Sequence, residues 1–173
     1  MGRKQKLPIS FFSNDVLDVA PNLLGKSIVR KFDDGTIGKY IITEVEAYRG
    51  VEDLACHASK GRTARTEIMF HAGGVVYVYL IYGMYWMLNI VTGKEGDASA
   101  VLIRGMNDIS GPGRVGKVLQ LDKSFYGEDL STSERLWTED SKLKPDYITT
   151  PRIGIDFAGE PWISKPWRFV IKE

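Results

Sequence analysis

The chain has 173 residues, of which 43% are hydrophobic and 26% are charged. This balance is ordinary for a soluble globular protein, and the length is that of one domain spanning residues 1–173. The single cysteine, Cys56, excludes an internal disulfide framework, and two histidines are too few for a zinc site, so we expect no metal. Because the formal net charge is +1, any basic surface must come from local clustering.

The N-terminal segment MGRKQKLPISFF is basic but is not followed by an apolar stretch of signal-peptide length. Its first residues also lack the serine or threonine of a myristoylation motif. Together with the sparse use of cysteine, these features predict an intracellular protein, in the cytoplasm or nucleoid of a bacterium or in a nucleus.

A short helix and two strands are expected first along the chain. Ser13 or Asn14 is suited to cap the helix, and Pro21 should break or kink it. The strands are predicted over 26–32 and 37–48, because an Asp-Gly pair between them is a strong hairpin signal.

The second of these strands carries acidic side chains. Because side chains alternate along a strand, Glu44, Glu46 and Tyr48 should share one face, and the opposite face, with Ile41 and Val45, is more apolar. Two neighbouring carboxylates repel each other unless solvent or a cation offsets their charge. They could activate water or stabilise a cationic transition state, or they could simply be an exposed face of an edge strand.

The loop over 49–74 holds glycines and a local basic cluster. His57 in this loop is either a catalytic residue or a hydrogen-bonding loop residue. Lys60, Arg62 and Arg65 follow it and could contact phosphates, although a solvated loop explains them equally well.

The most distinctive segment is the uncharged run VVYVYLIYGMYWMLNIV, from Val75 to Val91. Its tyrosines, its β-branched residues and the internal Gly83 favour a strand–turn–strand hairpin over a membrane span. Aromatic side chains at the tip of such a hairpin are suited to insertion into a partner.

A largely buried strand is predicted over 98–104. It ends in Arg104, which points either into a polar cavity or into a structural ion pair. The Gly-Pro-Gly at 111–113 then opens a short helix, where Arg114 and Lys117 add positive charge near backbone N–H groups that suit an anion.

Three further elements are predicted towards the C-terminus. A helix is expected over 129–138, where Ser131 and Glu134 have capping-box spacing, and strands are expected over 152–157 and 167–172. Strands outnumber helices and most connections look like hairpins. The predicted fold class is therefore α+β, around a mainly antiparallel sheet.

Taken together, these segments resemble the alkyladenine (3-methyladenine) DNA glycosylase family. The similarity covers nearly the whole chain in order, and it is carried mainly by FFSNDVLDVAPNLLGK, TEVEAYRGVEDLACHASKGRTART, VYVYLIYGMYWMLNIV, SGPGRVGK and PRIGIDFAGEPWISKPWRFVI. It implies a single compact domain on a curved, mainly antiparallel β-sheet, with surrounding short helices. It also implies a protruding β-hairpin that enters the minor groove of double-stranded DNA.

The resemblance also implies roles for the aromatic residues. Tyr82, at the hairpin tip with Met84 beside it, would take the place of an extruded nucleotide. The flipped base would lie between Tyr48 on one side and His57 and Tyr79 on the other.

The remaining roles concern selectivity, catalysis and contacts with DNA. Asn89 matches the asparagine that disfavours the exocyclic amine of guanine, Glu46 matches the carboxylate that activates water, and Arg104 matches the arginine that helps to hold that water. Basic residues expected to contact DNA are Arg62, Arg65, Arg114 and Lys117.

The predicted function is hydrolysis of the N-glycosidic bond of a damaged purine of the 3-methyladenine, 7-methylguanine, hypoxanthine or ethenoadenine class. The core motif contains no lysine, which indicates a monofunctional enzyme without a lyase step. We expect no cofactor, no membrane association and a monomer. Two alternatives stay open: a catalytically silent protein that binds damaged DNA, and a small-molecule hydrolase or transferase on a related fold.

Overall fold

The computed structural model describes residues 6–173. Residues 1–5, which belong to the N-terminal segment considered above as a signal peptide, lie outside the described residues. The helices are α1 (Val16–Leu23) and α2 (Pro112–Val118). The strands are β1 (Ser27–Lys31), β2 (Ile37–Arg49), β3 (Val76–Ile81), β4 (Tyr85–Thr92), β5 (Ser99–Met106), β6 (Ile109–Ser110), β7 (Leu136–Glu139), β8 (Tyr147–Thr150) and β9 (Arg168–Ile171).

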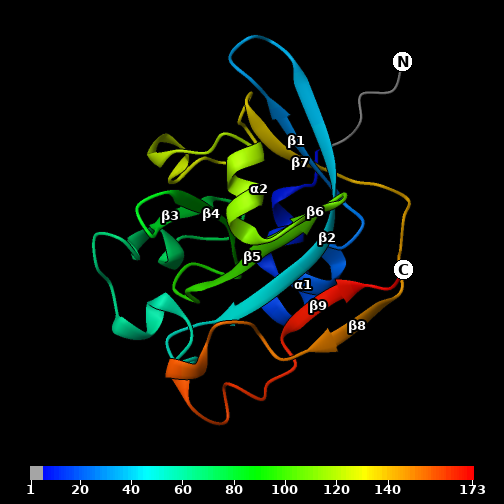
Figure 1. Cartoon of the computed structure of the whole chain (residues 1–173). Coiled ribbons are helices and arrows are strands. Elements are labelled where there is room, and N and C mark those ends of the chain that lie inside the picture. The colour runs from blue at the N-terminus through cyan, green and yellow to red at the C-terminus, as the bar shows by residue number, and fades with distance from the viewer. Residues whose placement is uncertain (1–5) are drawn as a thin grey trace.

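The described strands form one strongly curled antiparallel sheet (Figure 1). Its main path runs β3-β4-β5-β2-β1-β7, while β9 pairs with both β2 and β8, and β6 pairs with β5. Helix α1 packs against β2 and β5, and α2 packs against β4 and β5. Short 3-10 turns complete the structure, and the predicted α+β class with a curved antiparallel sheet is confirmed.

The two helices are short. Helix α2 packs so closely against β4 that a Cβ atom on Gly116 would lie 1.8 Å from the carbonyl oxygen of Trp86. Only glycine fits at this position. No helix within residues 6–173 is long and apolar enough to cross a membrane.

Strand β2 lies inside the sheet, with β1, β5 and β9 as neighbours. Its register against β5 shifts on both sides of Glu44, as a β-bulge does. The extra residue changes which side chains face the core: Ile42 and Val45 are fully buried, whereas Ile41 is exposed. The expectation that Ile41 shares the apolar face with Val45 is therefore wrong.

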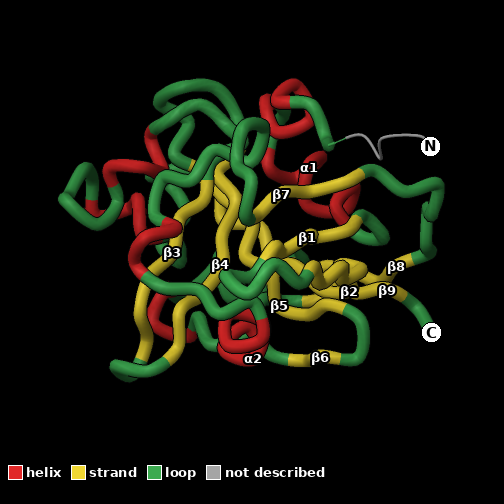
Figure 2. The backbone as a smooth tube through the Cα atoms, turned by 90° about the horizontal axis from the view of Figure 1, so that it is seen from above, coloured by secondary structure: helices red, strands yellow, loops and turns green. Residues whose placement is uncertain are grey.

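Strands β3 and β4 form the predicted hairpin, paired from Val76↔Ile90 to Ile81↔Tyr85. The turn is closed by a 3.1 Å hydrogen bond from the N–H of Met84 to the carbonyl of Ile81. Its two central residues have positive φ, as a type I′ turn requires. Figure 2 shows this hairpin extending away from the rest of the sheet beside α2.

The helix expected over 129–138 is wrong. Turns lead instead into β7, which pairs with β1. The carboxylate of Asp129 accepts hydrogen bonds of 2.8 Å and 2.6 Å from the backbone N–H and the hydroxyl of Ser131. Ser133 also accepts from the backbone of Leu136. Such local side-chain bonds satisfy the backbone in a non-helical form and compete with a helix.

The strand expected over 152–157 is also wrong. The backbone N–H of Ile153 donates to a side chain of β2 rather than to a sheet partner, and a 3-10 turn follows at Asp156–Ala158. The strand that pairs with β9 comes earlier in the chain, as β8.

Two element boundaries differ as well. Asp15, not Ser13 or Asn14, caps α1 by accepting a 2.9 Å hydrogen bond from the N–H of Leu17. Strand β5 continues past Arg104 to Met106, so the arginine lies within the strand.

Candidate active site

A cavity of about 340 Å³ opens beside the β3–β4 hairpin. Strands β2 to β5, the loop that carries His57 and the segment around Ile153 supply its walls, which are mainly aromatic and aliphatic with a few polar groups. Small-molecule sites typically have volumes of roughly 300–1,000 Å³ and this mixture of lining groups.

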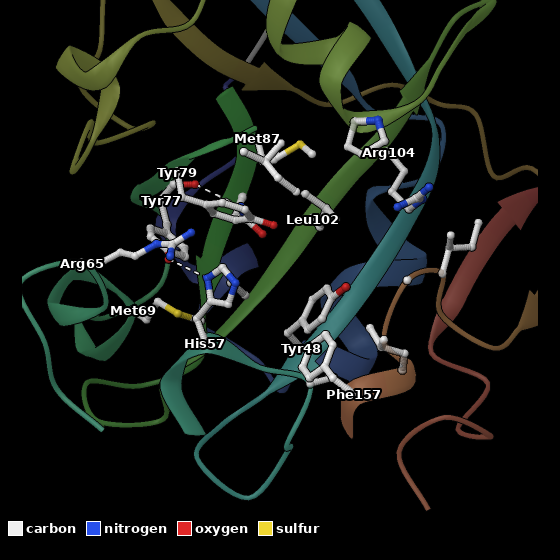
Figure 3. A pocket seen from close by; sticks show the side chains of 18 of the residues that line it. Tyr48, His57, Arg65, Met69, Tyr77, Tyr79, Met87, Leu102, Arg104 and Phe157 are labelled. Atoms are coloured by element: carbon white, nitrogen blue, oxygen red, sulfur yellow. Dashed lines mark hydrogen bonds between the residues drawn. The ribbon is translucent and has the colours of Figure 1, made fainter. Parts of the chain in front are cut away.

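Aromatic side chains face each other across this cavity. Figure 3 shows Tyr48 and Phe157 on one side and His57, Tyr77 and Tyr79 on the other. The ring centroids of His57 and Tyr79 are 4.5 Å apart, and those of Tyr77 and Tyr79 are 5.4 Å apart. The predicted base-binding residues therefore come together, with a gap between two aromatic walls.

His57 is held in place by the hydroxyl of Tyr77, which lies 2.8 Å from its Nδ1 atom. Burial, helped by the positive charge of Arg65, lowers the pKa of His57 to about 4. The imidazole is therefore neutral at physiological pH and has no spare proton to give to a leaving group.

Polar groups are few in the walls. Asn89 is buried on β4 and donates a 3.3 Å hydrogen bond to the carbonyl of Tyr77 on β3. The guanidinium of Arg65 lies 5.0 Å from the ring centroid of Tyr79, in the range of a cation–π contact. Burial raises the pKa of Tyr79 to about 12, so its hydroxyl stays protonated.

Glu46 is completely buried, directly behind the Tyr48 wall. Its Oε1 atom accepts a 2.8 Å hydrogen bond from the hydroxyl of Tyr48, and Nη1 of Arg104 lies 3.7 Å away. Its Oε2 atom accepts a 2.7 Å hydrogen bond from the N–H of Ile153. Burial raises the pKa of Glu46, although Arg104 and the Ile153 N–H oppose the shift. The carboxylate is thus a stronger base than an exposed one.

Two arginines offset the repulsion between the carboxylates of Glu44 and Glu46, and both of them contact Glu44. Its Oε2 atom lies 2.8 Å from Nε of Arg104 and 2.9 Å from Nε of Arg168. Burial opposes its ionisation, but the two arginines outweigh this effect and lower the pKa of Glu44. Arg104 lines the cavity and also forms this ion pair, so both of its predicted environments are present. The alternative of an exposed edge-strand face is wrong.

The hairpin tip stands at the mouth of the cavity. Tyr82 is among the lining residues, yet 85% of it is exposed, and the neighbouring Met84 is 63% exposed outside the cavity. Tyr82 has φ 53°, a left-handed conformation that costs a non-glycine residue roughly 1–2 kcal/mol. The type I′ turn imposes this conformation, and it leaves the aromatic side chain exposed at the end of the hairpin.

The other predicted basic residues lie outside the cavity. Arg62 forms a 2.8 Å ion pair with Glu67 and lies over Phe70. Arg114 and Lys117 are exposed on α2, which packs against the hairpin strand β4.

The sequence matches the model of a known protein family, "Methylpurine-DNA glycosylase (MPG)", over residues 10–109 and 107–173. The chain belongs to the methylpurine-DNA glycosylase family. It is therefore a DNA glycosylase, a hydrolase that acts on N-glycosyl bonds in DNA, and the predicted family is confirmed.

Curated relatives of the glycosylase agree with this. A protein of Wolbachia pipientis is 48% identical, covering 94% of this chain and 89% of its own length. One from Legionella pneumophila is 44% identical over 98% of this chain and 96% of its own. One from Methanocella arvoryzae is 41% identical over 96% of this chain and 92% of its own. All three carry the name "Putative 3-methyladenine DNA glycosylase".

Several residues of the candidate site were not predicted from the sequence. The backbone N–H of Ile153 holds Glu46, and Phe157 lines the cavity with 75% of its surface exposed. A buried ion pair between Asp53 and Arg152 lies next to them. The only sequence feature that could have indicated these residues is a charged residue, Arg152, beside apolar residues. The hydrogen bond from the backbone N–H of Ile153 to Glu46 cannot be predicted from residue types.

Proposed function

We propose that the glycosylase extrudes a damaged purine from duplex DNA into the cavity and hydrolyses its N-glycosidic bond, leaving an abasic site. The observation that carries this proposal is the buried Glu46, which is hydrogen-bonded to Tyr48 in the aromatic wall of a cavity of about 340 Å³. An enzyme cannot reach a glycosidic bond inside a stacked duplex, so the nucleotide must leave the helix at a cost of roughly a few kcal/mol.

The hairpin tip would offset that cost. Tyr82, with Met84 beside it, would enter from the minor groove and fill the gap that the extruded base leaves, as inserted apolar side chains do in other minor-groove proteins. Arg62, Arg65, Arg114 and Lys117 would contact the phosphates on either side.

The extruded base would stack between Tyr48 and the pair formed by His57 and Tyr79. Stacking on an aromatic side chain contributes roughly 1–3 kcal/mol per base. A cationic alkylated purine is electron-poor and should stack well on electron-rich tyrosines. Asn89 would contact the edge of the base and disfavour guanine, whose exocyclic amine is an additional donor.

Glu46 would carry the chemistry. The bond between C1′ and the base nitrogen breaks through an oxocarbenium-like state, and its electron pair leaves with the base. A carboxylate stabilises the positive charge that develops on the sugar and takes a proton from the water that attacks C1′. The Oε1 atom lies between Tyr48 and Arg104, two cavity-lining side chains, which supports the proposal that Arg104 would hold that water.

The leaving group determines which lesions react readily. A cationic base such as 3-methyladenine or 7-methylguanine departs as a neutral molecule without a proton. Hypoxanthine and ethenoadenine leave more readily when protonated. Because the pKa of His57 is about 4, its imidazole is unprotonated at neutral pH and would not supply this proton. We therefore propose faster excision of the cationic bases. Among the described residues that line the cavity none is a lysine, which supports a monofunctional enzyme.

The decisive experiment incubates the protein with duplex DNA that contains 3-methyladenine or hypoxanthine and measures released base and abasic sites. We expect base release without strand cleavage, and a protein that sediments as a monomer. Tight lesion binding without release would indicate a damage-binding protein instead. A protein that neither binds nor releases the base would overturn the proposed reaction and favour the small-molecule alternative.

A further inference from the structure

The ion pair between Asp53 and Arg152 lies beside the candidate active site but outside the cavity. Both side chains are completely buried. The guanidinium spans the carboxylate with contacts of 2.6 Å from Nη1 to Oδ2 and 3.0 Å from Nη2 to Oδ1. This two-point contact fixes the orientation of the arginine as well as its position.

Three segments meet at this pair. Nη1 of Arg152 also donates a 2.9 Å hydrogen bond to the carbonyl of Ala47 on β2. The carboxylate of Asp53 accepts from the backbone N–H groups of Arg49 and Ala55, each at 3.0 Å, and so holds the turn that follows β2. Arg152 therefore ties its own segment to β2 and to the turn that leads to His57.

Two residues of the proposed chemistry, Glu46 and Tyr48, are connected to this ion pair. Ile153, the next residue after Arg152, donates its N–H to Glu46. The guanidinium also lies 4.9 Å from the ring centroid of Tyr48 and 5.0 Å from that of Trp167. Because Arg152 is buried and does not line the cavity, it contacts Tyr48 from the protein interior rather than from the cavity.

Stabilisation of the core alone does not explain this buried ion pair. The Nε atom of Arg152 is buried without a hydrogen-bond partner, which is unfavourable, and apolar residues often replace a buried ion pair without loss of stability. What an apolar residue cannot supply is a fixed orientation of the backbone next to it.

We infer that Arg152 and Asp53 are positioning residues that hold the N–H of Ile153 on Glu46 and the ring of Tyr48 against the base. This inference rests on the proposed role of Glu46. The other charged or titratable groups facing Glu46 are Arg104 on β5, Tyr48 on β2 and Tyr79 on β3, and the substitutions below leave them intact. A hydrogen bond to the ionised carboxylate favours ionisation, so its loss raises the pKa of Glu46.

The test is the pH dependence of single-turnover excision of hypoxanthine by the Arg152→Lys variant. Lysine keeps the charge but cannot span both oxygens of Asp53, so we expect the acidic limb of the profile to move up by about one pH unit. Arg30→Lys is the matched control, because Arg30 is a buried arginine with contacts to Leu119 and β7 rather than to the site. It should lose stability without shifting the limb.

A second variant, Ile153→Pro, removes the N–H directly at a position whose side chain is half-exposed, and it should shift the limb in the same direction. It decides the question if Arg152→Lys does not fold. The pKa of Glu46 can also be followed by NMR of labelled carboxyl carbons. If the wild type proved inactive, the proposed function would fail, whereas an unchanged pKa of Glu46 in the folded variants would overturn only the positioning role.

Discussion

The hairpin tip and the buried site of Glu46 behind the cavity wall, which we call the floor, are built in opposite ways. At the tip, Tyr82 and Met84 are mostly exposed, and Tyr82 carries backbone strain. At the floor, Glu46 is completely buried and both of its oxygens accept hydrogen bonds. The tip is arranged for contact with something outside the protein, and the floor is arranged to hold one charged group in one place.

The difference follows from what each region must do. An aromatic residue that replaces a base gains free energy only when it leaves water, so it must be exposed beforehand. A carboxylate that stabilises positive charge acts most strongly where water is excluded and its partners are fixed. Substitutions should therefore affect chemistry at the floor and lesion engagement at the tip.

The largest expected effect is that of Glu46→Gln. Excision should fall by roughly 10²- to 10⁴-fold, the usual contribution of a general base, while lesion binding is retained. The amide oxygen can still accept from Ile153, and the amide N–H₂ can donate to the hydroxyl of Tyr48. Glu44→Gln is the matched control, because Glu44 lies on the same strand and contacts the same Arg104.

Single-turnover excision and lesion binding, measured for both variants, check this prediction. The control should keep most of the activity. Normal excision by Glu46→Gln would mean that another residue carries the reactive carboxylate. The assignment of the chemistry to the buried Glu46 would then be wrong.

The next effect is that of Tyr82→Ser at the tip. Loss of one stacking contact of roughly 1–3 kcal/mol should weaken lesion binding by about 5- to 150-fold. The melting temperature should stay unchanged, because the side chain is exposed. Binding is measured on duplex DNA with the lesion, and excision on a pre-extruded base in single-stranded DNA should be less affected.

The control for Tyr82→Ser is Ile37→Ser, which removes an exposed apolar side chain near the end of the β1–β2 hairpin. It should leave binding unchanged. Equal losses in both variants would mean that Tyr82 contributes only general surface hydrophobicity.

A smaller effect is expected from His57→Gln, and it concerns acid stability. The pKa of His57 falls from 6.5 to about 4 on folding, so its contribution to stability is complete above pH 6.5 and is lost as the pH falls towards 4. As the pH falls from 6.5 to 4, the free energy of unfolding should therefore decrease less in the variant than in the wild type, by on the order of 2 kcal/mol.

Denaturant unfolding at several pH values checks the His57 prediction, with the exposed His71→Gln as control. The shape of the excision profile above pH 5 should not change, because His57 is neutral there. A lost limb in that range would show that His57 does transfer a proton.

The smallest effect is expected at Cys56, which is buried in a hydrophobic cluster that Tyr48 and Tyr79 pack against. Burial raises the pKa of its thiol to about 12, so a thiol reagent should not modify the folded protein. Cys56→Ala should cost roughly 1 kcal/mol of stability and leave excision nearly unchanged. In that background Tyr82→Cys should react at once, and slow labelling there would contradict the exposure of the tip.

Much of the framework was predictable from local patterns. The alternation of Glu44, Glu46 and Tyr48, the turn signal at Gly83 and the apolar strand before Arg104 were all interpreted correctly as strands or turns. The predictions failed where side chains bind the backbone locally, as Asp129 does, or where a bulge changes the face of a strand, as at Ile41. Neither effect changes the periodic pattern of apolar residues from which helices and strands are predicted.

The family, the hairpin and the acidic strand were determined by the sequence alone, because periodicity and motif order are properties of the chain itself. The run from Val75 to Val91 is uncharged throughout, yet only the folded molecule divides it into a buried base and an exposed tip. Likewise, the contacts of Glu46 with Ile153 and of Asp53 with Arg152 join residues about a hundred positions apart. Such pairs depend on how the sheet curls, which is decided by packing over the whole molecule rather than by any local pattern.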